Sequence, residues 1–371
     1  MFFLILTTTT AVLLMIYCAL LLYFRPGFDR LKQGNSTSQP TVTVIVPAHN
    51  EADNLPSLLE KLSVQTYPAQ LVEIILADDR STDNTYEIMH QFISRHHNAR
   101  MIRIQEKDIS ASPKKQAILR AITVSTSEII LLTDADTLPD KDWISEMIRL
   151  YDKDTGLVFG YAPFRTDGPY DTLFHRMLAL ENFGMGAIAA AAAGRKHPVT
   201  SFGANFSYRR KLFEDLDGFG DSIKILSGDD DLFLHRAKKH PVYKIRFSAA
   251  PGSIVFTYPP LNFRHFIRQR IRFASKHLAY PKPVVAVLSI VYLFYLCLLL
   301  NLIGCFFNPS FIIGIIFFLA IKTFCELTFL LKAQKRLERR NLLIYYPLAV
   351  IPHLFYVVLF PVLGQFFRKR W

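Results

Sequence analysis

The chain has 371 residues, of which 51% are hydrophobic, and its mean hydropathy is positive at +0.21. A soluble domain rarely averages above zero, so the composition indicates a membrane-embedded part and excludes intrinsic disorder, collagen-like repeats and a small disulfide scaffold. Lys and Arg number 43 against 31 Asp and Glu, which gives a net charge of +12. The four cysteines lie inside apolar runs and lack metal-ligand spacing.

The positive charge collects at the ends of apolar runs. Residues 264–282 carry six Lys or Arg and no acid, residues 332–341 carry five and one acid, and Arg368, Lys369 and Arg370 close the chain. A nucleic-acid binder would be expected to carry its bases on a soluble body instead. We therefore expect contact with negatively charged membrane lipids and no nucleic-acid partner.

Four apolar runs are candidates for membrane segments. Residues 2–24 are uncharged and long enough to span a bilayer, and the lack of a preceding positive region or a following cleavage site favours an uncleaved anchor over a signal peptide. The C-terminal region, 284–371, holds the other three, at about 284–307, 310–331 and 342–367.

Two features of these C-terminal runs carry further expectations. Lys322 and Glu326 stand one helical turn apart and are expected to pair inside the membrane. The last run contains Pro347, Pro352 and Pro361, so a kinked or re-entrant segment is also considered.

The distribution of Lys and Arg predicts an integral membrane protein of the plasma or inner membrane. The positive-inside rule places the soluble body and the 332–341 loop in the cytoplasm. If the last run spans fully, the basic C-terminus lies on the opposite side, and the sequence leaves this conflict open.

A soluble body occupies residues 41–260, after a polar linker at 25–40 and before an amphipathic interfacial segment at 261–283. Its first half alternates strand patterns with helix patterns. This alternation predicts an α/β fold with a mostly parallel sheet flanked by helices, and ligands bind such sheets at the carboxyl ends of the strands. The strands are expected at 42–46, 73–77, 101–104 and 129–133, and the helices at 53–65, 83–95 and 114–123.

Acidic residues follow two of these strands. Asp134 and Asp136 come directly after 129–133, where two carboxylates can share one hard cation such as Mg²⁺ or Mn²⁺, although Asp-x-Asp is also common in turns and helix caps. Asp79 follows 73–77 and could accept hydrogen bonds from a nucleobase or ribose, and an ordinary capped turn is the alternative.

Three consecutive acids, Asp229, Asp230 and Asp231, form a second cluster. Their mutual repulsion raises the pKa of at least one, which suits a general base, while a solvated acidic loop is the alternative. Downstream, cations alternate with apolar residues over 263–273. This pattern predicts an amphipathic helix on the membrane, whose arginines could also hold a diphosphate.

Taken in order, these motifs resemble the membrane-bound family 2 glycosyltransferases, which are inverting enzymes with the GT-A fold and include polysaccharide synthases and ceramide glucosyltransferase-like enzymes. The resemblance implies nucleotide-sugar binding by the first βα turn, by Asp79 at the nucleobase, by Lys115 in a Lys-x-x-Ala-Leu-Asn-like helix and by Asp134. It implies that Asp134 and Asp136 hold the metal. The residues of the first turn are Pro47, Ala48, Asn50 and Glu51.

The second half of the body extends the resemblance. Gly203 and Asn205 resemble the acceptor-side segment, and Asp229 with Asp230 stands where a Glu-Asp pair is usual, which makes Asp230 the implied base, with the register uncertain by one residue. Further on, Gln269, Arg270, Arg272 and Phe273 resemble the donor-binding Gln-x-x-Arg-Trp motif. Three residues depart from the family pattern: Arg80 replaces Gly, Arg120 replaces Asn and Phe273 replaces Trp.

The resemblance implies a membrane-anchored enzyme that uses Mg²⁺ or Mn²⁺ to move a sugar from a nucleotide sugar, first of all a UDP-sugar, to a hydroxyl group. Basic interfacial segments beside the soluble body favour a lipid acceptor, with a polysaccharide acceptor and processive synthesis as the alternative. A non-catalytic membrane scaffold that keeps the fold is the third hypothesis.

Overall fold

The computed structural model describes residues 1–106, 111–309, 311–337 and 341–366. The basic residues Arg368, Lys369 and Arg370 lie outside these ranges. The chain divides into two compact units, and each is described by itself. An α/β unit comprises Asp29–Arg165 and Ile188–Pro259, and a helical unit comprises Met1–Phe28, Thr166–Ala187 and Pro260–Trp371.

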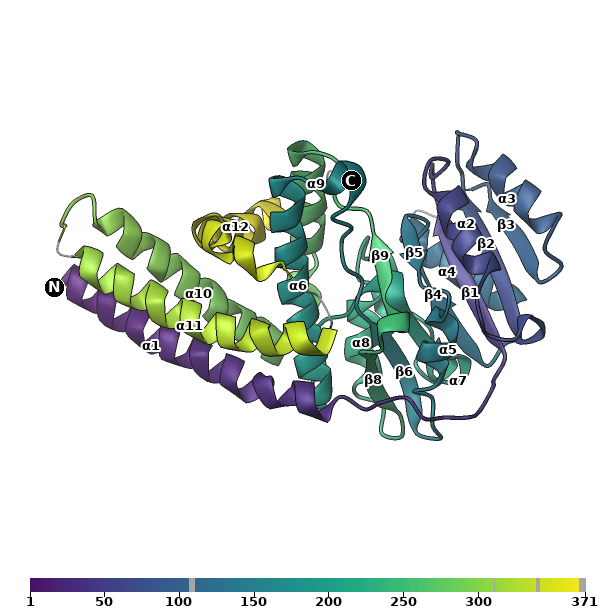
Figure 1. Cartoon of the computed structure of the whole chain (residues 1–371), viewed down its shortest axis with the longest axis horizontal. Coiled ribbons are helices and arrows are strands. Elements are labelled where there is room, and N and C mark those ends of the chain that lie inside the picture. Colours follow the sequence, from purple (N-terminus) through teal and green to yellow (C-terminus); the bar gives the residue numbers. More distant parts are fainter. Residues whose placement is uncertain (107–110, 310, 338–340, 367–371) are drawn as a thin grey trace. The chain divides into compact units, whose positions relative to one another are not determined.

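A mixed sheet forms the centre of the α/β unit (Figure 1). Strand β1 is parallel to β2 and β4, β2 to β3, and β6 to β8, whereas β7 is antiparallel to β4 and β6. This confirms the predicted α/β fold with a mostly parallel sheet. Among the described residues the sheet has seven strands, in the order β3 (Ala99–Ile104), β2 (Val72–Asp79), β1 (Val42–Ala48), β4 (Ile129–Leu132), β7 (Phe206–Arg209), β6 (Thr155–Gly160) and β8 (Lys244–Ser248).

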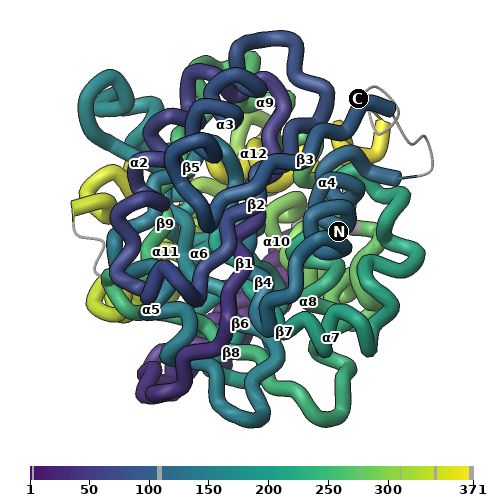
Figure 2. The backbone as a smooth tube through the Cα atoms, turned by 90° about the vertical axis from the view of Figure 1, so that its right-hand side faces the viewer, coloured from purple at the N-terminus to yellow at the C-terminus, as the bar shows by residue number. Residues whose placement is uncertain are grey.

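Helices cover both faces of this sheet, and the central strands are accordingly buried and mostly apolar. Residues 42 to 46 of β1 are all 0% exposed. On one face, α2 (Leu55–Ser63), α3 (Thr85–Ile93) and α5 (Trp143–Ile148) contribute to one apolar core with β1, β2 and β4. Helix α4 (Pro113–Val124) contacts β1, β2 and β3 (Figure 2). Its Ala117 packs with Ala77 and Ile104 in a separate cluster.

An aromatic cluster anchors the segment after β7. Phe206 and Tyr208 alternate along the strand and so point to the same face. Tyr208 meets a ring of α7 (Arg210–Asp215), and both meet a ring of α8 (Asp231–Ala237). A ring of the loop between these helices packs on those two rings, and all these centroids lie 4.8 to 6.3 Å apart. The partner rings are Phe213, Phe219 and Phe233. This packing holds α8 against the sheet, directly after the first two acids of the triplet.

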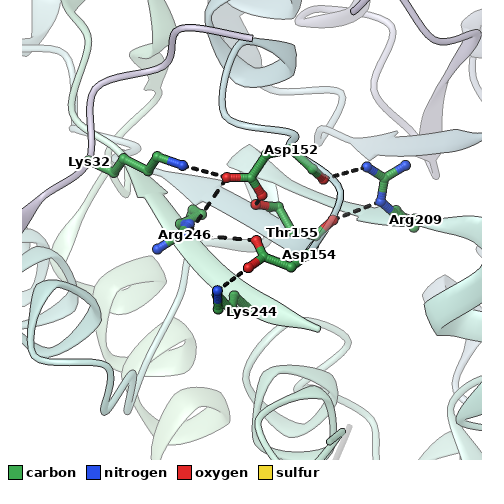
Figure 3. Close-up of polar contacts among 7 residues, drawn as sticks. All are labelled: Lys32, Asp152, Asp154, Thr155, Arg209, Lys244 and Arg246. Carbon is green, nitrogen blue, oxygen red and sulfur yellow. Dashed lines mark hydrogen bonds and ion pairs between the residues drawn. The ribbon is translucent and has the colours of Figure 1, made fainter. Parts of the chain in front are cut away.

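Ion pairs join β6, β7 and β8 to the linker at the edge where β6 and β8 begin (Figure 3). The carboxylates just before β6 accept contacts from three cations, and a guanidinium from the end of β7 donates to backbone carbonyls of the same turn. A hollow of about 830 Å³ lies at this edge, lined in part by Tyr151. The network comprises Lys32, Asp152, Asp154, Thr155, Arg209, Lys244 and Arg246.

The helical unit contains the predicted apolar segments. Helices α1, α10 and α11 contact one another, α10 contacts α12, and α12 contacts α9 (Figure 1). Helix α6 (Leu173–Gly194) starts in this unit and enters the α/β unit at Ile188. The bounds are α1 (Phe2–Phe24), α9 (Phe263–Ala274), α10 (Lys282–Gly304), α11 (Phe311–Leu337) and α12 (Tyr346–Phe366).

Five helices in the described part of the chain are long and apolar enough to cross a membrane, namely those over Leu4–Arg30, Leu173–Gly194, Lys282–Gly304, Phe311–Leu337 and Leu343–Phe366. The second of them, α6, is 67% buried inside the protein, so its apolar character is accounted for by packing. Helix α12 continues through Pro352 and Pro361 as one helix.

Lys322 and Glu326 of α11 form the predicted ion pair, with the Lys322 ammonium 2.8 Å from a Glu326 carboxylate oxygen. Three tyrosines from other helices donate to the same carboxylate: Tyr17 of α1 at 2.6 Å, Tyr295 of α10 at 3.1 Å and Tyr346 of α12 at 2.5 Å. Lys322 is 1% exposed. The Glu326 carboxylate thus binds four helices of this unit together.

Removing the Lys322 ammonium leaves the buried Glu326 carboxylate without its ion-pair partner. We expect Lys322→Met to destabilise the helical unit by about 3 kcal/mol and to lower Tm in detergent micelles. Lys335→Met, at an exposed position of the same helix, should leave Tm unchanged. Adding Glu326→Gln to Lys322→Met should restore part of the lost stability. If Lys322→Met has the same Tm as Lys335→Met, the ion pair does not stabilise the helical unit.

Candidate active site

Acidic side chains from three strands meet at one edge of the sheet. Strands β1, β2 and β4 are parallel and neighbouring, so their carboxyl ends lie side by side. Glu51 follows β1, Asp79 ends β2, and Asp134 and Asp136 follow β4. The topology therefore brings together the acids that the sequence analysis selected on separate strands.

Lys114 bridges two of the predicted motifs. Its ammonium lies 2.6 Å from the Asp134 carboxylate and 2.9 Å from the Asp229 carboxylate. Burial alone lowers the pKa of Lys114, but the two carboxylates more than offset this and raise the pKa above its ordinary value. One charged group thus joins the Asp-x-Asp motif after β4 to the acidic triplet, although Asp134 and Asp229 lie 95 residues apart in the sequence.

The carboxylates at this edge repel one another. Burial and, after it, the nearby charges of Asp134 and Glu51 raise the pKa of Asp136 to about 7, while Lys114 opposes the shift. Burial likewise raises the pKa of Glu51, whose carboxylate accepts a hydrogen bond of 2.8 Å from Asn54. Such a site has an excess of negative charge and favours the binding of a cation.

The first two turns at this edge are tied together by hydrogen bonds. Asn50 has a φ of 56°. Its backbone amide donates to the Ser81 hydroxyl at 3.0 Å, and its side-chain oxygen accepts from the Thr82 backbone amide at 2.8 Å. Pro47 and Ala48 end β1 opposite Ala77 and Asp78. Of the residues predicted in the first turn, Glu51 approaches the acidic cluster and Asn50 shapes the backbone of both turns.

Asp79 is held by its neighbour. The Arg80 guanidinium contacts both carboxylate oxygens, at 2.8 and 3.1 Å, while the backbone of Arg80 has a φ of 60°. A side chain in this left-handed region costs about 1 kcal/mol, and the two-pronged contact with Asp79 offsets it. This accounts for the departure from the usual Gly, and any ligand of Asp79 meets a carboxylate already engaged by Arg80.

The three acids of the triplet have different surroundings. Asp231 accepts a hydrogen bond from the Ser201 amide at 2.8 Å and from the hydroxyls of Ser201 and Thr200 at 3.2 Å. Asp230 begins α8, where its carboxylate accepts from the Asp231 amide at 2.7 Å. Asp229 faces Lys114. The structure therefore anchors Asp231 in the fold and leaves Asp229 and Asp230 as the candidates for chemistry.

Gly203 lies against these two candidates. A methyl group added at its Cα would stand 3.3 Å from an Asp229 oxygen and 3.4 Å from an Asp230 oxygen. Asn205, which the resemblance places on the acceptor side, is 0% exposed, accepts from the Trp143 indole at 2.9 Å and donates to the carbonyls of Tyr161 and Ser253. Gly203 thus contacts the acidic cluster, whereas Asn205 cross-links the core beneath it.

The two adjacent lysines of α4 lie differently. Lys115, which the resemblance assigns to the donor, is 1% exposed and donates to backbone carbonyls of the 222–227 segment. Lys114, which the sequence analysis did not select, contacts the acidic cluster. One signal was present in the sequence: the three-residue spacing of Lys-x-x-Ala fits Lys114 and Ala117 as they stand.

The remaining predicted donor residues, Gln269, Arg270, Arg272 and Phe273, lie on α9 in the helical unit. Arg270 is 3% exposed, pairs with Glu181 of α6 and stands 5.7 Å from the centroid of the Tyr356 ring. Arg272 is exposed, 5.5 Å from the Phe273 ring centroid. The guanidinium of Arg270 is therefore engaged within the helical unit, while that of Arg272 is exposed.

The donor set at the strand ends fits a hard divalent cation. In the described part of the chain no three His, Cys, Asp or Glu side chains are arranged to hold a metal ion by themselves. Mg²⁺ and similar ions are commonly held by one or two carboxylates, with phosphate oxygens of the substrate completing the shell. Asp134 and Asp136, with their excess of negative charge, match that mode.

Comparison with known families identifies this domain. Residues 43–217 match the model of glycosyl transferase family 2, and they span β1 to β7 with the strand ends described above. These residues therefore form a family 2 glycosyltransferase domain.

Two relatives agree with this assignment. The chain is 28% identical over 243 residues to the probable glycosyltransferase YdaM of Bacillus subtilis, covering 65% of this chain and 56% of that protein. It is 25% identical over 238 residues to a dolichol-phosphate mannosyltransferase of Pyrococcus furiosus, covering 61% and 63%. The chain thus matches less than two thirds of the length of either relative.

The fold extends over the whole chain in one solved structure. The mannosyltransferase PcManGT from Pyrobaculum calidifontis, determined in complex with GDP-Man and Mn²⁺, has a TM-score of 0.62 and 20% identity, and the match covers 98% of this chain and 100% of that one. The GT-A fold with its apolar helices is therefore shared.

The anchoring role of Asp231 gives a stability prediction. Asp231→Ala leaves the buried Ser201 amide without its acceptor, and we expect a loss of about 2 kcal/mol in the free energy of unfolding, measured as a lower Tm. Asp221→Ala removes an exposed acid ten positions earlier and should leave Tm unchanged. Equal Tm values for both variants would show that Asp231 is not an anchor.

Proposed function

We propose that this protein is a membrane-embedded inverting glycosyltransferase that moves a sugar from a nucleoside-diphosphate sugar to a hydroxyl group of a lipid. The observation that carries the proposal is the Lys114 ammonium between Asp134 and Asp229, with Glu51 and Asp136 close to Asp134. Residues that could hold the donor diphosphate thus lie near a possible catalytic base, which supports the proposal.

In this proposal the donor diphosphate binds at the ends of β1 and β4. Asp134 and Asp136 would hold Mg²⁺ or Mn²⁺, and the bound ion supplies positive charge to the phosphate oxygens. Lys114 lies beside Asp134 and carries a positive charge of its own, which favours the negative charge that grows on the departing nucleotide. The choice between the two ions rests with experiment.

The proposed transfer is a single displacement. The acceptor oxygen forms a bond to the anomeric carbon as the bond from that carbon to the diphosphate oxygen breaks, and the configuration inverts. The Asp230 carboxylate takes the proton from the acceptor hydroxyl, and the nucleoside diphosphate leaves with the electron pair. Gly203 provides the space beside the Asp229 and Asp230 oxygens that this attack needs.

Apolar helices in the same chain as the catalytic domain support a lipid acceptor. The described chain has five helices long and apolar enough to span a membrane. The name of the Pyrococcus furiosus relative states a lipid-linked substrate, dolichol phosphate. We propose that α9 lies at the membrane interface and that the α/β unit is on the cytoplasmic side of a plasma or inner membrane, where nucleotide sugars are made.

The nucleobase of the sugar donor is decided by experiment. A UDP-sugar is the first choice, through Asp79, but Arg80 engages both oxygens of that carboxylate. We therefore propose a direct test in native-like lipid with labelled UDP- and GDP-sugars and with Mg²⁺ or Mn²⁺. Label that partitions into organic solvent supports a lipid acceptor. Label in precipitable polymer indicates a polysaccharide synthase, and no transfer from any donor favours a non-catalytic scaffold.

The catalytic base is tested by Asp230→Asn. This substitution keeps the side-chain size and the helix cap, but the amide cannot accept the proton of the acceptor hydroxyl. We expect kcat to fall by about 100- to 10,000-fold with the donor Kd unchanged. Asp221→Asn, at an exposed position, serves as the control and should retain the wild-type kcat. If Asp230→Asn turns over normally and Asp229→Asn does not, the base is Asp229.

The metal site is tested by Asp136→Asn together with chelation. EDTA should abolish transfer by the wild-type protein, and added Mn²⁺ or Mg²⁺ should restore it. In Asp136→Asn the loss of one carboxylate ligand should raise the metal concentration needed for half-maximal activity by about tenfold or more. Transfer that persists in EDTA would show that the carboxylates serve another purpose.

A further inference from the structure

Most carbonyl oxygens of the segment before the acidic triplet are bonded by two residues at the start of α4, the N-cap Ser112 and Lys115. Five of the six carbonyl oxygens from Ser222 to Ser227 accept hydrogen bonds from Ser112 or Lys115. The Lys115 ammonium donates to the carbonyls of Ser222 at 2.6 Å, Ile225 at 2.9 Å and Ser227 at 3.2 Å. The Ser112 amide and hydroxyl donate to Ile223 at 2.8 Å and Leu226 at 3.1 Å.

This arrangement needs a cation with several donors. An ammonium group has three N–H bonds that can point in different directions, and three carbonyl oxygens from one short segment lie within hydrogen-bond distance of it. Lys115 is 1% exposed, and its ammonium stands 5.8 Å from the centroid of the Phe219 ring. Carbonyl dipoles and an aromatic face offset the cost of burying this charge, so the folded domain stabilises the Lys115 ammonium at this position.

The held segment leads directly into the candidate base. Gly228 follows Ser227 with a left-handed φ of 83°, and Asp229, Asp230 and the first turn of α8 come next. From the neighbouring position on α4, Lys114 contacts the Asp229 side chain. The start of α4 therefore contacts the acidic segment twice, through its backbone by Lys115 and through a carboxylate by Lys114.

We propose that Lys115 is a positioning residue, which sets the place of Asp229 and Asp230 by holding the 222–227 backbone and does not touch the donor. This inference rests on the proposed function for its kinetic consequence only. A displacement of a reacting group by about 1 Å can lower a rate about 100-fold without any loss of substrate binding. A lysine bound to the donor would instead affect donor affinity first.

The test compares Lys115→Met with Lys224→Met, which removes an exposed lysine from the same segment. Three quantities are measured on the full-length protein in lipid nanodiscs: kcat, the Kd of UDP and GDP, and hydrogen–deuterium exchange over residues 222–231. For Lys115→Met we expect kcat to fall about 100-fold, the nucleotide Kd to stay within about twofold, and exchange over 222–231 to accelerate. Lys224→Met should match the wild type in all three.

Two further variants keep the inference testable. Lys115→Arg retains the charge and several donors and should recover part of kcat and part of the protection from exchange. If Lys115→Met fails to fold, Ser112→Ala removes only the hydrogen bond to the Leu226 carbonyl and should shift kcat and exchange in the same direction by a smaller factor.

The opposite pattern would overturn the positioning role. A Lys115→Met variant with a nucleotide Kd weakened tenfold or more and with unchanged exchange over 222–231 would place Lys115 at the donor. If the wild-type protein transfers no sugar, the proposed function fails, but the exchange data still decide whether Lys115 holds the segment. Unchanged exchange in every variant contradicts it.

Discussion

Parallel strands end at the same edge of a sheet, and here each of the central strands delivers acidic residues to that edge. Carboxylates gathered in this way repel one another, and the Lys114 ammonium between Asp134 and Asp229 is the contact that offsets part of this repulsion. The balance is incomplete, as the raised pKa of Asp136 shows. The edge is therefore stable enough to form and still favours a cation.

Helix α4 supports this edge through two neighbouring residues with different tasks. Successive residues of a helix point about 100° apart, so Lys114 and Lys115 reach different surroundings from adjacent positions. One contacts carboxylates and the other contacts backbone carbonyls. The central strands of the sheet beneath are buried, and Asn205 ties the core through three hydrogen bonds. The buried core thus positions the side chains of the site.

The helical unit follows the same physical principle in an apolar setting. Its charged pair is buried among four helices, and the remaining oxygen lone pairs of Glu326 accept from tyrosines of three different helices. The i, i+4 spacing predicted the Lys322–Glu326 pair from one helix alone. The tyrosine partners come from segments as distant as α1, and no local pattern indicates them, because their meeting depends on how the helices pack.

The sequence by itself determined the α/β fold, the apolar segments and the acidic motifs, because each rests on a local pattern of period two or 3.6 or on a short motif. Three things were decided by tertiary structure alone: that Lys114, not Lys115, faces the acidic cluster, that Asp231 is an anchor, and that Asp229 meets Asp134. Each depends on contacts between segments 30 to 115 residues apart. Long-range contacts are set by packing around the sheet, and neighbouring residues of like type differ there only in the direction of their side chains.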